Sequence, residues 1–220
     1  MRWKRWVGIK IESISDNELL WIQRMNGKWR WNLAMSYSSE EMRTRDAILD
    51  KFYTLDYLCC KQGVVAEIVV LGGAALLLLM EQMGEQFRPT RDIDVHLIST
   101  NNMQALLREL EKINVDVVGG IMEVPPSEDL RNKESLFELD LDFSAIRVYV
   151  PTIELLACCK IFSTREKDLI DLKETQILEK CDTEKLLGMV AEYREYLLNP
   201  SNQDLNLYEL DNILKEKGIL

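Results

Sequence analysis

The sequence lacks several features that would point to whole classes of protein. His96 is the only histidine among 220 residues, which excludes a His-rich zinc site. The apolar run Ile68–Met80 is 13 residues long and includes two glycines, whereas a membrane-spanning helix needs about 20 residues. The basic N-terminus is not followed by an uninterrupted apolar segment, so we expect no signal peptide. These absences predict a cytoplasmic protein with no membrane partner.

Cysteine is present, but its pattern carries no metal-binding signal. The five cysteines form two adjacent pairs and a single residue: Cys59, Cys60, Cys158, Cys159 and Cys181. Adjacent cysteines inside helical patterns do not have metal-ligand spacing, and the number is odd. We therefore predict reduced and buried thiols, which are usual in the cytoplasm.

Positive charge is scarce over most of the chain. The formal net charge is −10, which argues against broad, nonspecific binding to DNA or RNA. Residues 1–31 are the exception, because they contain seven Lys or Arg, three Asp or Glu and all five tryptophans. This shift in composition, with the helical patterns near the C-terminus, predicts three regions. They are a basic Trp-rich appendage (1–36), a core (37–150) and a helical region (151–220).

The predicted appendage 1–36 contains a hairpin signal, Asn26-Gly27, between two tryptophan-bearing segments. Two interpretations stay open. Its tryptophans can cover one face of the core, which is the interpretation that we favour. They can also form a basic, aromatic surface that stacks on RNA or binds a protein partner.

Residues 64–98 carry the most informative pattern of the chain. Val65–Leu71 is mostly apolar and rich in β-branched residues, as in a buried strand. Gly72-Gly73 then permits a sharp turn and the close approach of a ligand. Ala74–Met80 continues as an apolar helix. The next strand carries Asp92-Ile93-Asp94-Val95, and side chains two residues apart on a strand share a face.

Asp92 and Asp94 are therefore predicted to lie side by side. Neighbouring carboxylates repel one another, and a cation between them removes the repulsion. Because Mg²⁺ prefers oxygen ligands, both residues are candidate metal ligands. The alternative is a surface pair whose repulsion is screened by water or neutralised by Arg88 and Arg91.

A strand, Gly72-Gly73, a helix and Arg91-Asp92-Ile93-Asp94 on the next strand resemble the DNA polymerase β-like nucleotidyltransferase superfamily. The resemblance implies transfer of a nucleoside monophosphate from an NTP to an acceptor hydroxyl, with Mg²⁺ in a two-metal site. It also implies that Gly72 and Gly73 seat the triphosphate and that Arg91 contacts phosphate. Many members carry Ser after the glycine pair, whereas this chain has Ala74, so a hydroxyl for the phosphate is absent there.

A third carboxylate for such a site should come from a neighbouring strand. Asp116 lies in the short hydrophobic strand Val115-Asp116-Val117-Val118, and a short hydrophobic strand is the context of the third aspartate in the superfamily. Asp140 and Asp142 are the alternatives, on a later stretch with strand-like alternation. Those two aspartates also fit a solvated strand face.

A second cluster of charged residues lies between Lys160 and Leu172. Its residues predict a helix end, a Ser163-Thr164 cap and a new helix that carries Asp168 and Asp171. The cluster resembles the Lys…Arg-x-Lys-Asp-x-x-Asp-Leu signature of the abortive-infection, type IV toxin-antitoxin branch. That resemblance implies that Lys160 contacts a phosphate and that Asp168 is a base that activates the acceptor hydroxyl. Alternatively, Asp168 and Asp171 pair with Arg165 or Lys167 and fasten the helices.

The remaining local signals complete an α/β (α+β) fold. Ser38 and Glu41 form a capping box for a helix that Gly63 ends. Residues 139–149 predict a strand that turns into a late hairpin, and the chain is helical from Pro151 onward. We therefore predict a nucleotidyltransferase fold with a small mixed sheet and a C-terminal helical bundle.

The acceptor stays open at this stage: it can be RNA or tRNA, a protein, or a small molecule. The resemblance to toxin-antitoxin proteins favours RNA or protein and a protein partner. Arg88–Asp94 is also similar to lincosamide and aminoglycoside nucleotidyltransferases, and the acidic core would suit a cationic antibiotic. The alternative from another functional class is a non-catalytic protein on the same fold, either nucleotide-binding or antitoxin-like and regulatory. Two features suggest it: Ala74 in place of Ser, and the open choice of the third carboxylate.

Overall fold

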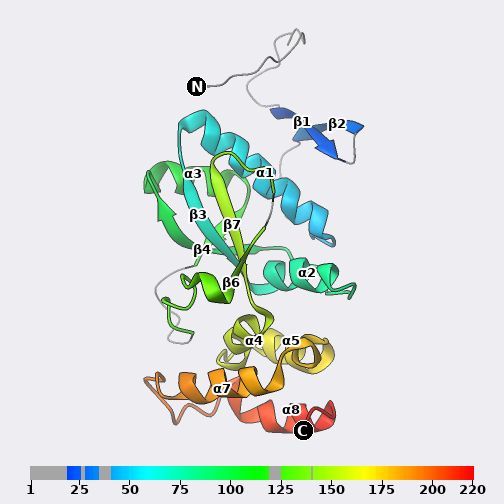
Figure 1. Cartoon of the computed structure of the whole chain (residues 1–220), viewed down its shortest axis with the longest axis vertical. Helices are drawn as coiled ribbons and strands as arrows, with labels where there is room; N and C mark the ends of the chain where they lie inside the picture. The colour runs from blue at the N-terminus through cyan, green and yellow to red at the C-terminus, as the bar shows by residue number, and fades with distance from the viewer. Residues whose placement is uncertain (1–18, 26–27, 35–40, 119–124, 140) are drawn as a thin grey trace. The chain divides into compact units, whose positions relative to one another are not determined.

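The computed structural model describes residues 19–25, 28–34, 41–118, 125–139 and 141–220 (Figure 1). The chain forms two compact units, Met1–Glu40 and Glu41–Leu220. The strands are β1 (Leu19–Met25), β2 (Lys28–Ala34), β3 (Ala66–Leu71), β4 (Ile93–Thr100), β5 (Val115–Val117), β6 (Leu136–Glu138) and β7 (Ile146–Pro151). The α-helices are α1 (Arg45–Gln62), α2 (Gly72–Gln82), α3 (Met103–Lys112), α4 (Ile153–Ile161), α5 (Glu166–Glu174), α6 (Ile177–Lys180), α7 (Thr183–Arg194) and α8 (Leu210–Glu216). Two 3₁₀ helices, η1 (Lys133–Ser135) and η2 (Asn206–Glu209), complete the described elements.

The smaller unit contains a two-stranded antiparallel sheet. Strands β1 and β2 pair from Leu19 opposite Ala34 to Met25 opposite Lys28. The pairing confirms the hairpin predicted around Asn26-Gly27, although these two turn residues lie outside the described residues. The two interpretations of the appendage stay predictions.

The larger unit is built on a five-stranded mixed sheet with the order β5-β4-β3-β7-β6. The central strand β3 runs antiparallel to β4 and parallel to β7. At the edges, β5 is parallel to β4, and β6 is antiparallel to β7. The mixed sheet and the helices that follow it confirm the predicted fold class.

The strand β3 leads directly into α2, and both are almost entirely buried. Five of the six β3 residues and all of Ala74–Met80 in α2 are buried. This burial explains why the sequence is apolar on every side here rather than amphipathic. The consequence is that the N-terminus of α2 is held at the end of the central strand.

The other helices of the larger unit surround this centre. Helix α1 contacts α2, α3 and β7, and α4 contacts α2, α5, α6 and α7. Figure 1 shows the helices from α4 onward gathered at one end of the sheet, below α2 in that view. The start of α2 therefore lies near the start of the helical region, which is what brings distant residues together at the site.

The capping box predicted at Ser38 and Glu41 is wrong. Helix α1 begins at Arg45, and the hydroxyl of Thr44 accepts a hydrogen bond from the backbone N–H of Ala47 at 3.3 Å. Residue 42 is instead extended, because Met42 pairs with Thr90 through two backbone hydrogen bonds. The predicted end of the helix is confirmed, since Gly63 has the left-handed conformation with φ 66°.

The strand predicted over residues 139–149 is also wrong in its first half. A hairpin does form, but from β6 and β7, and the described residues between them do not form a strand. The backbone N–H groups of Leu141 and Phe143 donate to carbonyl oxygens two residues earlier, at 2.8 and 2.7 Å, as in tight turns. The carboxylate of Asp56 then accepts hydrogen bonds from the backbone N–H groups of Ser144, Ala145 and Ile146. Those N–H groups are therefore unavailable to a partner strand.

The cysteine prediction holds in part. All five cysteines are free thiols, and Cys59, Cys158 and Cys181 are buried. Cys60 is exposed, contrary to the prediction, because its position on α1 faces away from the core. Among the described residues, no helix combines the length and apolar character needed to cross a membrane.

Candidate active site

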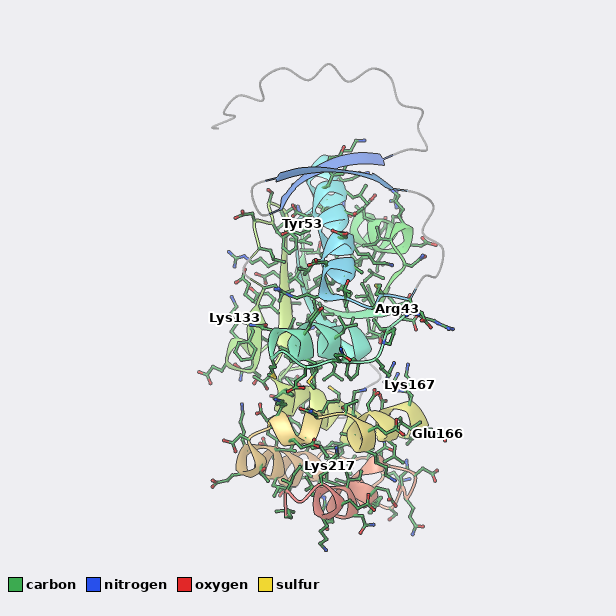
Figure 2. All side chains as sticks on the ribbon, turned by 90° about the vertical axis from the view of Figure 1, so that its right-hand side faces the viewer. Arg43, Tyr53, Lys133, Glu166, Lys167 and Lys217 are labelled. Atoms are coloured by element: carbon green, nitrogen blue, oxygen red, sulfur yellow. The ribbon has the colours of Figure 1, made fainter. Side chains whose placement is uncertain are left out.

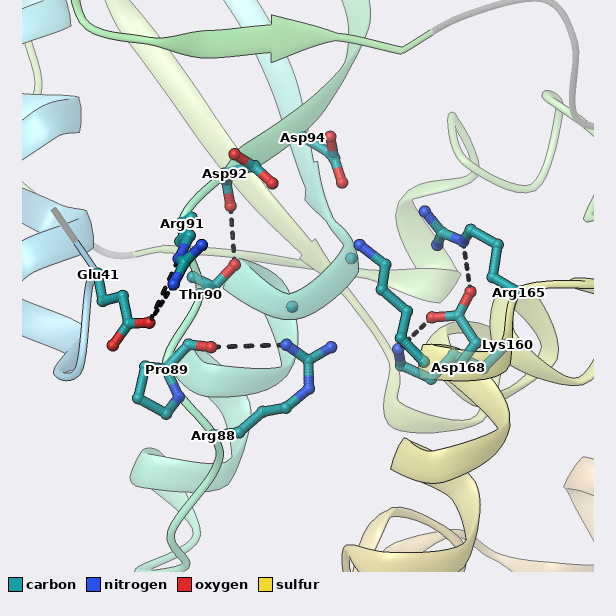
Figure 3. A pocket seen from close by; sticks show the side chains of 13 residues that line it. Glu41, Arg88, Pro89, Thr90, Arg91, Asp92, Asp94, Lys160, Arg165 and Asp168 are labelled. Carbon is teal, nitrogen blue, oxygen red and sulfur yellow. Dashed lines mark hydrogen bonds and ion pairs between the residues drawn. The ribbon is translucent and has the colours of Figure 1, made fainter. Parts of the chain in front are cut away.

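A pocket of about 290 Å³ lies where the start of α2, the approach to β4 and the junction of α4 with α5 meet (Figure 3). Its lining is almost entirely polar and contains both acidic and basic side chains. The lining residues are Glu41, Gly72, Gly73, Arg88, Pro89, Thr90, Arg91, Asp92, Asp94, Lys160, Arg165, Lys167 and Asp168. Of the eight site residues predicted from the sequence, Asp116 is the one that does not line it.

Gly72 and Gly73 form the first turn of α2, and local geometry favours glycine at both positions, most strongly at Gly72. Gly72 has φ 62°, and a Cβ atom there would lie 2.7 Å from Oδ2 of Asp94. A Cβ atom on Gly73 would lie 3.0 Å from the hydroxyl oxygen of Thr90. Because neither residue has a side chain, the backbone of Gly72 and Gly73 itself forms this part of the pocket wall. The first N–H groups of a helix have no partner inside the helix, so this turn can bind an anion.

Asp92 and Asp94 lie together at one side of the pocket, as the sequence predicted (Figure 3). Asp92 is exposed and precedes β4, whereas Asp94 is half-buried within β4. Burial is the main cause that raises the pKa of Asp94. Asp92 and Asp116 raise it further, while Arg165 and Lys167 act in the opposite direction. The carboxylate of Asp94 is thus surrounded by charges of both signs.

Asp116 lies on β5, directly opposite Asp94 in the parallel register of the two strands. It is exposed. The competing candidate Asp142 follows β6, near the beginning of β7, whereas Asp94 is paired with Leu71 at the far end of β3. Asp140 lies outside the described residues. Strand register therefore brings Asp116, and not Asp142, next to the carboxylate pair.

The donor set fits Mg²⁺, although it is not a closed cage. Among the described residues, no three His, Cys, Asp or Glu side chains form a group that could hold a metal ion. Mg²⁺, however, is usually bound by one or two carboxylates together with water and substrate phosphates. Asp92 and Asp94 provide two such oxygen ligands at the wall of an open pocket, so a phosphate-bearing substrate would complete the coordination.

Arg91 lies at the rim of the pocket and is paired with Glu41. Its Nη2 lies 2.9 Å from Oε1 of Glu41, and its side chain is largely exposed. Hydrogen bonding with Arg91 is the main cause that lowers the pKa of Glu41. Glu41 is held near Arg91 because the neighbouring Met42 pairs with Thr90.

Lys160 is buried within a chain of ion pairs. Its Nζ donates to Oδ1 of Asp168 at 2.7 Å and to Oδ2 of Asp171 at 2.6 Å. Asp171 also accepts from Nη2 of Arg88 at 2.8 Å, and Asp168 accepts from Nε of Arg165 at 2.6 Å. We call these five residues the buried ion-pair network, after Lys160, Asp168 and Asp171, whose side chains are at most 4% exposed.

The two oxygens of Asp168 are fully engaged. Oδ1 accepts from Lys160, and Oδ2 accepts from Arg165 and from the hydroxyl of Ser163 at 2.8 Å. Burial acts to raise the pKa of Asp168, but the charge of Lys160 and these hydrogen bonds outweigh it, so the pKa lies below its usual value. Asp168 is thus an ionised, tightly held acceptor, and both sequence-based interpretations agree with its place at the pocket wall.

Sequence reasoning did not assign Glu41, Thr90, Arg165 or Lys167 to the site. For Arg165 and Lys167 a signal was present, because both lie in the same short segment as Asp168 and are charged. For Glu41 and Thr90 no local signal exists, since their position depends on the backbone pairing of residues 42 and 90. In the alternative interpretation Arg88 would neutralise the carboxylate pair, whereas in the structure it contacts Asp171.

The comparisons with known proteins bear on the whole arrangement. Residues 50–213 match the family described as "Nucleotidyltransferase of unknown function" (DUF6036). No curated protein matches the chain. One similar solved structure is that of an antigenic nucleotidyltransferase-like protein from Paracoccidioides brasiliensis, with 15% identity and a TM-score of 0.37 over 77% of this chain and 89% of the other. The family match spans most of the chain, including every pocket residue from Gly72 to Asp168, and the chain therefore belongs to the DUF6036 family of nucleotidyltransferases.

Proposed function

We propose that the protein is a Mg²⁺-dependent nucleotidyltransferase that moves a nucleoside monophosphate from an NTP to an acceptor hydroxyl. The observation that carries the proposal is the approach of the glycine turn of α2 to the carboxylate of Asp94 within one polar pocket. Such a turn suits an anionic triphosphate, and the carboxylates suit the cation that accompanies it. The family match supports the same chemistry.

Some residues of the pocket would bind the phosphates, and others would bind the metal ion. The N–H groups of Gly72 and Gly73 would bind the triphosphate, and Arg91 would bind it once released from Glu41. Lys160 uses two of its three N–H donors within the protein, which leaves one for a phosphate oxygen. Ala74 is buried in the core and takes no part.

Asp92 and Asp94 would hold Mg²⁺ in the presence of nucleotide. When bound, the ion would neutralise part of the charge that develops on the leaving pyrophosphate. The register that pairs Asp94 with Asp116 supports Asp116 as the third carboxylate, on the side of the site open to solvent. From there it can hold a second ion or accept the proton of the acceptor hydroxyl.

For the acceptor, we propose a hydroxyl of RNA or tRNA, or of a protein, as in the toxin-antitoxin branch that the sequence resembles. An antibiotic acceptor receives less support. Five basic side chains line the pocket, namely Arg88, Arg91, Lys160, Arg165 and Lys167, and they would repel a cationic drug. A possible protein partner follows from the same resemblance.

A second candidate function is non-catalytic nucleotide binding, as in an antitoxin-like or regulatory protein. The observation that favours it is the lack, among described residues, of a three-carboxylate group able to hold a metal ion. The two candidates differ in whether bound NTP is consumed.

Incubation with each α-³²P-labelled NTP, Mg²⁺ and three acceptors, namely total RNA, purified tRNA and protein, tests the proposal. We expect label on one acceptor, and we expect Asp116→Asn to remove it. The matched control is Asp142→Asn, which changes an exposed aspartate away from the pocket and should retain the label. Nucleotide binding without transfer to any acceptor would favour the non-catalytic candidate.

A further inference from the structure

Arg165 is the basic residue of the pocket whose contacts best fit a phosphate ligand. It lies at the junction of α4 and α5, and its side chain is 55% exposed. Its Nε donates to Asp168, so the other edge of the guanidinium, with two Nη groups, is turned away from that contact. A planar guanidinium held at one edge presents a fixed pair of donors, which matches the geometry of phosphate oxygens.

The guanidinium of Arg165 faces the carboxylates across the pocket. Figure 3 shows it extending past Asp168 on the side where Asp94 lies. Asp94 and Arg165 both line this pocket, although they lie on elements that are far apart in the sequence. An anion bound between Asp94 with its cation and the turn at Gly72 would therefore meet Arg165. Lys167, which projects from the start of α5 in Figure 2, also lines the pocket.

The position of Arg165 depends on a series of ion pairs. Asp168 holds Arg165, Lys160 holds Asp168, and Asp171 holds Lys160. Asp171 in turn is held by Arg88, which comes from the segment before β4. Each buried carboxylate thus has two basic partners, and the network connects the two walls of the pocket. A general base needs an oxygen that faces the acceptor, whereas both oxygens of Asp168 already accept hydrogen bonds.

We propose that Arg165 binds the triphosphate of the NTP opposite Asp92 and Asp94, and that Asp168 is a positioning residue that holds Arg165 in place. This inference rests on the proposed function, because it presupposes a nucleotide in the pocket. It assigns to Asp168 an effect on nucleotide affinity, whereas a base would affect only the rate of transfer.

Titration calorimetry with Mg²⁺ and an α,β-methylene NTP tests the inference without any acceptor. We expect Arg165→Ala to raise Kd about tenfold or more, as the loss of a charge-assisted hydrogen bond would. The Kd of Arg165→Lys should lie between those of the wild-type protein and Arg165→Ala, because lysine retains the positive charge but lacks the paired N–H donors of the guanidinium. Asp168→Asn should raise Kd about as much as Arg165→Ala, and the double variant should be no weaker than Arg165→Ala alone.

A matched control separates positioning from general loss of stability. Glu154→Gln removes the charge of a different buried carboxylate, on α4. This carboxylate contacts Lys185 and lies outside the pocket lining. It should lower the melting temperature while leaving Kd unchanged. If Asp168→Asn does not fold, Arg165→Ala and Arg165→Lys still decide the first half of the inference, because the side chain that they change is exposed.

The outcomes are distinct. An unchanged Kd in Arg165→Ala overturns the inference as a whole. An unchanged Kd in Asp168→Asn, or additive losses in the double variant, overturns the positioning role. If the wild-type protein itself binds no nucleotide, the proposed function fails, and this inference fails with it.

Discussion

Gly72 and Asp94 constrain each other at the scale of single residues. The glycine adopts a left-handed conformation, and a Cβ atom at this position would lie only 2.7 Å from Oδ2 of Asp94. A side chain at position 72 would be strained and would also displace the carboxylate. The position of the candidate metal ligand therefore depends on the backbone geometry at the start of α2.

Gly72→Ala tests that coupling. We expect a loss of about 1–3 kcal/mol in the free energy of unfolding, from backbone strain and overlap with Asp94. Nucleotide binding in the presence of Mg²⁺ should fall as well. Gly84→Ala is the control, because Gly84 has φ 78° but open space around its Cβ position. Denaturant titration of both variants gives the comparison, and equal losses with equal binding would mean that Asp94 simply moves aside.

Asp94→Asn tests the metal assignment. Mg²⁺ plus NTP should stabilise the wild-type protein by about 2.7 kcal/mol at a ligand concentration 100 times Kd. The variant should lose this gain in a thermal-shift measurement. Its melting temperature without ligand should be equal or higher, because burial and neighbouring carboxylates disfavour the ionised form of Asp94, as the raised pKa indicates. A ligand-induced shift of wild-type size in Asp94→Asn would exclude Asp94 as a metal ligand.

At the scale of elements, the buried ion-pair network fastens α5 to α4 and to the segment before β4. Lys160 contributes from α4, Asp168 and Asp171 from α5, and Arg88 from the segment before β4. A buried carboxylate that loses its partner is left uncompensated, so breaking such a network costs far more than removing a surface pair.

Lys160→Met tests the fastening. It keeps the length of the side chain but leaves Asp168 and Asp171 without their shared ammonium. We expect the free energy of unfolding to fall by about 3–5 kcal/mol. Lys167→Met changes an exposed lysine of the same pocket and should alter stability by about 0.5 kcal/mol at most. Chemical denaturation measures both variants, and similar values would show that the network contributes little to folding.

Local patterns predicted the elements that carry the candidate site, but not how these elements meet. The run from Val65 to Met80 could be assigned from hydrophobicity, because β3 and α2 are both buried. The Asp92 and Asp94 pair followed from strand alternation. The partner of Arg88 could not be predicted, because Asp171 lies 83 residues away and only folding brings them together. The first half of the strand predicted over residues 139–149 was wrong, because tight turns at Leu141 and Phe143 use their backbone N–H groups and Asp56, on a different element, binds the N–H groups that follow.

At the scale of the whole molecule, the two compact units raise the question of what the first one does. A two-stranded hairpin such as β1–β2 is at best marginally stable alone in water, so it needs further contacts. If the tryptophans of the appendage cover the core, deleting residues 1–36 should lower the melting temperature and promote aggregation. Each large apolar side chain that is fully buried contributes about 1.5–3 kcal/mol. This is the result that we expect from differential scanning calorimetry.

The opposite result would identify a binding arm. In that case the truncated protein would melt like the full chain and would lose affinity for its acceptor, with a smaller loss at high salt because the contact is electrostatic. A truncated protein that is equally stable and fully active would contradict both interpretations and mark the segment as dispensable.

The order of the strands has a consequence for the protein while it is being made. The central strand β3 pairs in parallel with β7, about 80 residues later in the chain. The ribosome therefore releases the glycine turn and the carboxylates well before Arg165, Lys160 and Asp168. At about 5–20 residues per second, this interval lasts several seconds. During that time the growing chain carries only part of the pocket, with Arg88 and Arg91 but without Lys160, Arg165 and Lys167, so any activity begins only after α5 has been made.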